Sequence, residues 1–229
     1  MSKIAIIVAM QKELELIGSL MSDAQTVEIN GRKYTEGTIG GKEVILTQCG
    51  IGKVNAACGT TELINLWHPR AIINSGIAGG IDDKTRVMDI IIGAETVYHD
   101  VWCGEGNEYG QVQGLPCRFA ADENLYRAAK KLLPGGRIYG GLICSGDKFI
   151  TDKTDLAAIK KQFPEGLAVD MESGAVAQSC YLRGVPFLSL RIISDTPGNT
   201  DNHAAQYENF WSLAPEKSAA VICDLLAAL

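Results

Sequence analysis

Four acidic residues share one kind of position in the sequence, directly after a segment that is typical of a buried strand: Glu13, Asp170, Glu172 and Asp195. In an open, parallel α/β sheet the ligand lies at the carboxyl ends of the strands, so these positions are expected to face one crevice. The same strand ends carry neither a Ser-His-Asp set nor a group of metal ligands. Carboxylates of this kind suit acid–base chemistry on a neutral ligand with hydroxyls and ring nitrogens.

Each carboxylate also has a purely structural explanation. Glu13 stands in the first turn of a predicted helix, where a negative charge interacts favourably with the helix dipole. Asp170 and Glu172 begin another helix, so one of them could cap it while the other faces the crevice. Their side chains point in different directions, which excludes the close carboxylate pair of a glycosidase or an aspartic protease. Asp195 could form a structural ion pair with Arg191.

Two glycine-rich segments follow buried strands without matching a nucleotide-binding motif. In the segment 50–53, Thr47 stands where a Walker loop needs its first glycine and Val54 follows the lysine. Asn55 occupies the third glycine position of the dinucleotide pattern. The segment predicts either a close approach of backbone to a ligand or an ordinary strand-to-helix turn. Residues 74–80 are predicted as a second tight turn.

Apolar runs alternate with helical patterns along the whole chain, which predicts an α/β fold with a largely parallel central sheet. Strands are expected over residues 3–9, 27–29, 33–39, 43–49, 71–74, 87–96, 138–144, 167–169 and 186–193. Helices are expected over 11–21, 54–67, 122–133 and 153–163, then up to Arg183, and at the C-terminus, including 219–229. Residues 101–118 form a long glycine-rich and polar loop, the kind that usually binds something.

Composition narrows the classes of function. The net charge of −6 argues against nucleic acid or an anionic membrane as a partner. The apolar run near the N-terminus is too short for a membrane span and leads into Gln11 without a cleavage site, so a cytoplasmic protein is expected. Seven scattered cysteines form no Cys-x-x-Cys pair, and the three histidines stand far apart. They are expected to be reduced core thiols, and no metal or cofactor is predicted.

The chain resembles the methylthioadenosine/S-adenosylhomocysteine nucleosidases of the nucleoside phosphorylase superfamily. The matching segments occur in order along nearly the whole chain: 6–10 with Glu13, 50–54, 73–80, 98–100, 109–111, 145–150, 169–172 and 193–195. The resemblance implies a nucleoside phosphorylase-like fold, a single three-layer α/β/α domain over residues 1–229 with a mixed, mainly parallel central sheet. It also implies hydrolysis of the N-glycosidic bond of an adenine nucleoside that carries a 5′-thioether.

The resemblance implies a role for each matching residue. Asp195 would protonate adenine N7 and Glu13 would activate the attacking water, while Arg191 and Ser194 would orient Asp195. The other expected contacts are Glu172 to the ribose hydroxyls, Met171 to the sugar, Phe149 stacked on adenine, the backbone of Ile150 at the polar edge of adenine, and Tyr207 at the 5′ group; Ile51, Gly79 and Asp170 complete the substrate-binding set. In a homodimer, the 101–113 loop of the neighbouring subunit would close the site.

Two positions depart from the resemblance, and two other functions stay open. Many bacterial members have glutamate at the position of Asp170 and serine at that of Ile77, close to the expected water.

The first alternative is a phosphorylase that uses phosphate, although Glu13 beside Lys12 would repel that dianion. The second is a non-catalytic nucleoside-binding domain, which would have little need for Glu13, Glu172 and Asp195 together.

Overall fold

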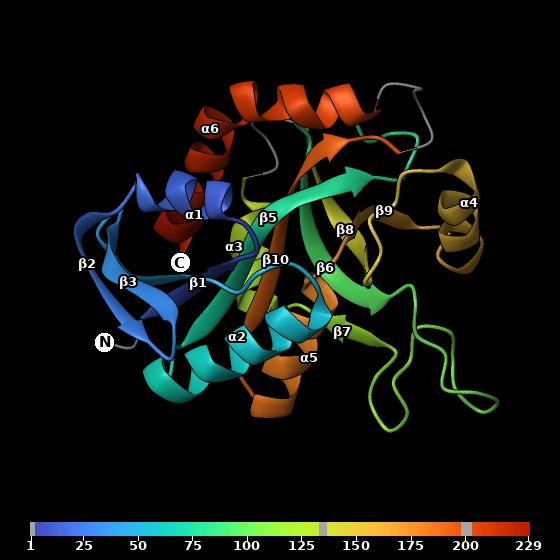
Figure 1. Cartoon of the computed structure of the whole chain (residues 1–229), viewed down its shortest axis with the longest axis horizontal. Helices are drawn as coiled ribbons and strands as arrows, with labels where there is room; N and C mark the ends of the chain where they lie inside the picture. The colour runs from blue at the N-terminus through green and yellow to red at the C-terminus, as the bar shows by residue number, and fades with distance from the viewer. Residues whose placement is uncertain (1–2, 133–136, 198–202) are drawn as a thin grey trace.

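The computed structural model describes residues 3–132, 137–197 and 203–229 (Figure 1). Within them the strands are β1 (Ile4–Val8), β2 (Ser22–Ile29), β3 (Arg32–Ile39), β4 (Lys42–Gln48), β5 (Ala71–Gly80), β6 (Ile90–Tyr98), β7 (Arg118–Ala120), β8 (Ile138–Ser145), β9 (Gly166–Asp170) and β10 (Phe187–Asp195). The helices are α1 (Gln11–Gly18), α2 (Lys53–Trp67), α3 (Glu123–Lys130), α4 (Lys153–Gln162), α5 (Ser173–Arg183) and α6 (His203–Ala228). The predicted α/β class is confirmed.

The strands form one mixed sheet that closes on itself. β5 pairs with β10, β10 with β6, β6 with β8, β8 with β9, and β9 pairs back with β5. The order β1-β4-β3-β2 extends from the other edge of β5. Half of the ten pairings described are antiparallel: β2–β3, β3–β4, β10–β6, β5–β9 and β6–β7. The mixed sheet is therefore confirmed. The parallel ladders β1–β4, β1–β5, β10–β5, β6–β8 and β8–β9 form its centre, while a meander and the strands that close the ring add the antiparallel pairs.

Buried apolar side chains fill both sides of this sheet. Ile4, Ile6 and Val8 of β1 belong to a core cluster that also includes residues of α1, α3 and α6. Ala5 and Ile7, on the opposite face of the same strand, belong to a second cluster with residues of α2 and α5. Figure 1 shows α1 and α6 on one side of the sheet and α2 and α5 on the other. β1 is thus buried on both faces, as its continuous apolar sequence predicts.

The predicted tight turn over residues 74–80 is wrong, because β5 continues as a strand to Gly80. Residues 75–78 pair with 190–193 of β10, and Gly79 and Gly80 pair with β9. Its glycines serve close packing instead of a turn: a Cβ atom on Gly80 would lie 2.6 Å from Oγ1 of Thr85. β5 therefore runs from the core to the edge of the sheet where the candidate site lies.

Other expectations differ mainly at the boundaries. β2 begins at Ser22, five residues before the expected strand, and α1 ends at Gly18. Residues 101–117 contain neither helix nor strand, as expected for the long loop. All seven cysteines are free, but only Cys49, Cys144 and Cys180 are buried, so the expected core position holds for three of them. Within the described ranges, no helix is both long and apolar enough to cross a membrane.

Candidate active site

The predicted residues meet in one pocket at the carboxyl ends of the strands. Its wall includes most of the expected set: Glu13, Ile51, Gly79, Phe149, Ile150, Asp170, Met171, Glu172, Ser194, Asp195 and Tyr207. Arg191 is expected there too, but it lies beneath the wall, almost completely buried. The ends of six strands (β1, β4, β5, β8, β9 and β10) and the helix α6 therefore build a single site from segments far apart in the sequence.

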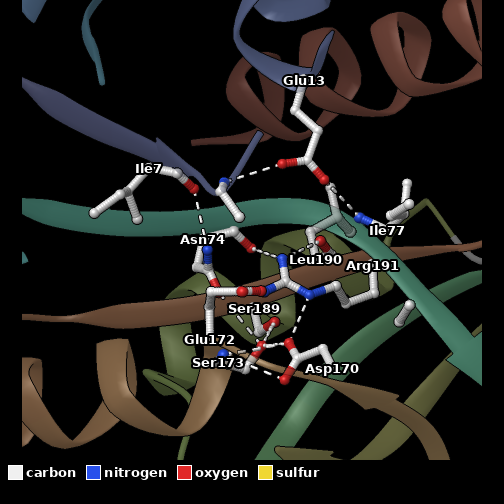
Figure 2. Close-up of polar contacts among 12 residues, drawn as sticks. Ile7, Glu13, Asn74, Ile77, Asp170, Glu172, Ser173, Ser189, Leu190 and Arg191 are labelled. Atoms are coloured by element: carbon white, nitrogen blue, oxygen red, sulfur yellow. Dashed lines mark hydrogen bonds and ion pairs between the residues drawn. The ribbon is translucent and has the colours of Figure 1, made fainter. Parts of the chain in front are cut away.

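Glu13 is held by backbone donors from two strand ends. Its Oε2 accepts hydrogen bonds from the N–H groups of Ala9 at 3.0 Å and Met10 at 2.9 Å. Its Oε1 accepts one from the N–H of Ile77 at 3.0 Å (Figure 2). Glu13 stands in the first turn of α1 and accepts a bond from the N–H of its N-cap residue Met10, which agrees with the structural explanation of this carboxylate. Burial raises the pKa of Glu13, while the Arg191 guanidinium and these three donors lower it.

The place of the Glu13 carboxylate depends on the absence of a side chain at Gly76. A Cβ atom built there would lie 2.8 Å from Oε1 of Glu13 and 3.1 Å from Nη1 of Arg191. Both distances are shorter than ordinary van der Waals contact. Glycine at this position lets the carboxylate and the guanidinium both lie against the backbone of β5.

Beneath the pocket, a buried polar network surrounds Arg191 (Figure 2). Its Nε donates to Oδ2 of Asp170 at 2.7 Å, and its other nitrogens donate to the side-chain and backbone oxygens of Asn74. Asn74 in turn donates to the carbonyl of Ile7 at 3.1 Å. A buried charge is tolerated only when it is paired and hydrogen-bonded, and this network satisfies that need.

The ion-pair partner of Arg191 differs from the expected one. In the part of the chain that the structure describes, the guanidinium pairs with Asp170 and not with Asp195. The expected contact of Ser194 is present, because its hydroxyl donates to Oδ1 of Asp195 at 2.6 Å. Asp195 is only 2% exposed, at the last residue of β10. Ser194 therefore contacts Asp195 directly, while Arg191 lies in the polar network beneath the site.

Asp170 and Glu172 divide the two tasks proposed for them from the sequence. Asp170 accepts hydrogen bonds from the backbone N–H of Ser173, at 3.3 Å, and from the Ser173 hydroxyl, and so satisfies a backbone donor at the start of α5, whose N-cap residue is Glu172. Glu172 points across the pocket and accepts a hydrogen bond from the N–H of Gly52 at 2.9 Å. Burial and the neighbouring Asp170 carboxylate raise the pKa of Glu172 to about 7.

The sequence allowed two interpretations of the segment 50–53, a strand-to-helix turn and a close approach of backbone to the site, and both apply. It is the turn from β4 to α2, with positive φ angles at Gly50 and Gly52. It also brings backbone to the site, because Gly52 contacts Glu172 and Ile51 lines the pocket. The positive end of the α2 dipole faces the Glu172 carboxylate, which favours its ionised form.

Aromatic rings form the outer wall of the pocket. Phe149 is 57% exposed although it is large and apolar, so its ring is open to a ligand. Tyr207 meets it edge to face, with 6.0 Å between ring centroids, and its hydroxyl lies 3.7 Å from Sδ of Met10. A flat, apolar surface of this kind suits stacking of a heteroaromatic ring.

Some site residues did not emerge from the sequence. Asn74 and Ser173 hold the floor, and Met10, Val169 and Lys148 line the pocket. Asn74 carried a readable signal, because it is a polar residue at the end of a buried apolar run. The described residues contain no group of three or more His, Cys, Asp or Glu side chains placed to hold a metal ion.

Comparisons with known proteins agree with this geometry. A family model described as the phosphorylase superfamily matches residues 3–227. A 5′-methylthioadenosine/S-adenosylhomocysteine nucleosidase of Lysinibacillus sphaericus is 41% identical, and the match covers 99% of this chain and 100% of that protein.

Solved structures of nucleosidases match the whole chain. The nucleosidase of Neisseria meningitidis, in complex with methylthio-immucillin-A, has a TM-score of 0.94 at 36% identity, and 100% of both chains is covered. That of Colwellia psychrerythraea, in complex with adenine, has a TM-score of 0.92 at 34% identity over 100% of this chain and 96% of that one. These matches cover the full length of the chain, and its carboxylates gather at the strand ends. The chain therefore belongs to the 5′-methylthioadenosine/S-adenosylhomocysteine nucleosidase family of the phosphorylase superfamily.

Proposed function

We propose that this chain hydrolyses the N-glycosidic bond of 5′-thio-substituted adenosines, releasing adenine and the 5-substituted ribose. The substrates proposed are 5′-methylthioadenosine and S-adenosylhomocysteine, with 5′-deoxyadenosine as a further candidate. The observation that carries the proposal is the convergence of Glu13, Glu172 and Asp195, all buried, on the wall of one pocket. The ligands named for the two solved relatives, methylthio-immucillin-A and adenine, support the same substrate class.

The reaction follows from the charges that develop as the base leaves. When the bond between C1′ and N9 breaks, positive charge builds at C1′ and O4′ of the ribose, and nearby carboxylates lower that barrier. Asp195 gives a proton to N7, so adenine leaves as a neutral base. Glu13 takes a proton from the water whose oxygen bonds to C1′. Glu172 holds the ribose hydroxyls.

The remaining contacts fix the substrate. Phe149 stacks on adenine and the backbone of Ile150 hydrogen-bonds its polar edge. Met171 lies against the sugar, and Tyr207 lies beside the 5′-thioether. The open ring of Phe149 and the contact between the Tyr207 hydroxyl and the sulfur of Met10 support these assignments.

Water is a better nucleophile than phosphate for this pocket. Among the described residues that line it, Lys148 is the single cation, and it pairs with Asp155. The Arg191 guanidinium lies below the wall and is paired with Asp170. A phosphate dianion needs several donors or cations and would meet four carboxylates here, those of Glu13, Asp170, Glu172 and Asp195. Phosphorolysis is therefore disfavoured.

The deciding experiment measures adenine release from a panel of 5′-substituted adenosines, with and without phosphate. Hydrolysis predicts equal rates in both conditions and a free 5-substituted ribose as the second product. A requirement for phosphate, with a ribose 1-phosphate product, would establish the phosphorylase. Tight binding of methylthioadenosine without release of adenine would establish a binding protein.

We also propose a homodimer in which the 101–113 loop of one subunit closes the pocket of the other. Of the described residues that line the pocket, none belongs to this chain's own loop. The loop carries Trp102, which is 57% exposed and stacked on Tyr109. Trp102→Ala is expected to raise KM for methylthioadenosine and to weaken the dimer in analytical ultracentrifugation, and a monomeric wild-type enzyme would contradict the proposal.

We also propose a domain organisation, a location in the cell and a metabolic role for this chain. The two helical layers that flank the sheet support a single three-layer α/β/α domain over residues 1–229, which predicts one cooperative unfolding transition. Removal of 5′-thioadenosines suits a cytoplasmic enzyme of methionine salvage and S-adenosylmethionine by-product recycling.

A further inference from the structure

A second, small cavity lies behind Glu13, on the side facing α1 and α6. Its volume is about 20 Å³. Its apolar wall includes Leu16 of α1, Ile192 of β10 and Phe210 of α6, and its polar wall is formed by Glu13 and Ser75. The cavity thus lies at the edge of the core cluster that packs α1 and α6 against the sheet.

Glu13 and Ile77 separate this cavity from the nucleoside pocket, because both residues line both spaces. Glu13 therefore borders two spaces. The nucleoside pocket is on one side, and the small cavity is on the other.

Ser75 gives the cavity a hydroxyl with hydrogen-bonding capacity to spare. Side chains alternate along a strand, so Ser75 points to the same face of β5 as Ile73 and Ile77, which pack with the core under α1 and α6. Within the residues that the structure describes, no protein donor or acceptor bonds to the Ser75 hydroxyl. Two polar groups, one charged and one neutral, face the same small space.

The size and the lining fit one water molecule. A space of about 10–15 Å³, measured for a water-sized probe, suffices for a single water, which needs two or more polar partners. Glu13 and Ser75 supply them. A larger ligand is excluded by the volume, and a dry cavity would be lined by apolar groups alone.

We propose that this cavity is a water site, in which one water bridges the Ser75 hydroxyl and the Glu13 carboxylate and replaces the water consumed in each turnover. The inference rests on the proposed hydrolysis. In that reaction the bond from C1′ to N9 breaks and a bond from C1′ to a water oxygen forms, while Glu13 takes the water's proton. The nucleoside blocks the pocket side, so a water stored behind Glu13 is already in contact with the base for the next cycle.

The direct test is a high-resolution crystal structure of the full chain with adenine. The expected result is an ordered water within hydrogen-bond distance of both Ser75 and Glu13. An absence of water density in the cavity would overturn the proposal. This measurement uses the wild-type protein, so it tests the proposal even if substitutions at Ser75 prevent folding.

The kinetic test fills the cavity with Ser75→Val and removes only the hydroxyl with Ser75→Ala. Ser75→Val is expected to lower kcat for methylthioadenosine by about tenfold with KM unchanged within about twofold, because the nucleoside contacts are intact. Ser75→Ala is expected to have a smaller effect in the same direction. Wild-type turnover of Ser75→Val would overturn the proposal.

The matched control is Thr96→Val. Thr96 is a buried strand residue of β6 whose hydroxyl has no partner among the described residues, and it lies outside both cavities. Loss of the Thr96 hydroxyl is expected to leave kcat unchanged. If Thr96→Val and Ser75→Val lower kcat equally, the effect of Ser75→Val is explained by altered core packing, and the proposal is contradicted. Failure of the proposed function is distinguishable, since the wild-type enzyme would then release no adenine without phosphate.

Discussion

Alanine at Gly76 tests whether the position of the Glu13 carboxylate governs the rate. The added methyl group would lie 2.8 Å from Oε1 of Glu13, so the carboxylate must move away from β5. This movement breaks the hydrogen bond of 3.0 Å from the Ile77 N–H. The backbone of a strand accepts alanine without strain, so the effect falls on the side chains of Glu13 and, at 3.1 Å from the added carbon, Arg191.

The magnitude follows from the bond that is lost. A hydrogen bond to a charged group contributes about 1.5–3 kcal/mol. If Glu13 needs this bond to hold its place in the transition state, kcat/KM falls roughly 10- to 100-fold, since each 1.36 kcal/mol is a factor of about ten. Adenine binding is expected to stay the same, because Phe149, Ile150 and Asp195 are unchanged.

The assay is adenine release from methylthioadenosine at several substrate concentrations, with adenine affinity measured in parallel. Gly18→Ala is the matched control: it adds a methyl group at the end of α1, where the nearest atom is Cδ2 of Leu46 at 3.8 Å. The control should keep its activity and gain a little stability from helix propensity. A folded Gly76→Ala enzyme with normal kcat/KM would refute the reasoning about Glu13.

Three further predictions concern the acid, the ribose-binding carboxylate and the floor of the site. Asp195→Asn should lower kcat by about 10²- to 10⁴-fold in the adenine-release assay while adenine still binds, and near-normal turnover would exclude it as the acid. Glu172 has a pKa of about 7 in the folded protein, above its usual value near 4.5. Between these two pH values the folded state keeps a proton that the unfolded state loses, so the free energy of unfolding falls as the pH rises. Urea unfolding of Glu172→Gln should therefore show a gain over wild type that grows from about pH 5 to pH 8, by at most roughly 3 kcal/mol, and a constant difference would contradict the shift. Arg191→Met leaves the buried Asp170 carboxylate without its cation and should cost about 3–5 kcal/mol of unfolding free energy, and a loss under about 1 kcal/mol would show that the pair is dispensable.

The positions of the site residues were largely predictable, because strand ends are readable in the sequence. Buried runs end at Asp170 and Asp195 and shortly before Glu13, which places these carboxylates at one edge of the sheet. The pairing of Arg191 was not predictable in the same way. Residues four apart are neighbours on a helix, but on a strand they are about 13 Å apart, so Arg191 and Asp195 are too distant for a direct pair. The true partner, Asp170, comes from another strand end, and the sequence does not encode that contact locally.

The strand and helix segments were predictable, but the strand partners were not. Apolar periodicity locates β1, β8 and β10 because it depends on neighbours in the sequence. The antiparallel contacts β10–β6 and β5–β9 depend on which distant segments meet, and no local pattern carries that information. Glycines at 76, 79 and 80 favour a turn by propensity, whereas tertiary packing requires them inside a strand.

The path of β5 has a consequence for how a nucleoside can enter. This strand is bonded to β1, β10 and β9, and it carries Asn74, Gly76, Ile77 and Gly79 from the floor of the site to its rim. A hinge that split the site in two would have to break ladder bonds on both edges of β5. Admission of the ligand is therefore left to groups at the mouth, such as the side chains of Phe149 and Tyr207 and the proposed loop of the neighbouring subunit. Their replacement can alter which 5′ groups are accepted without disturbing the acids on the rigid frame.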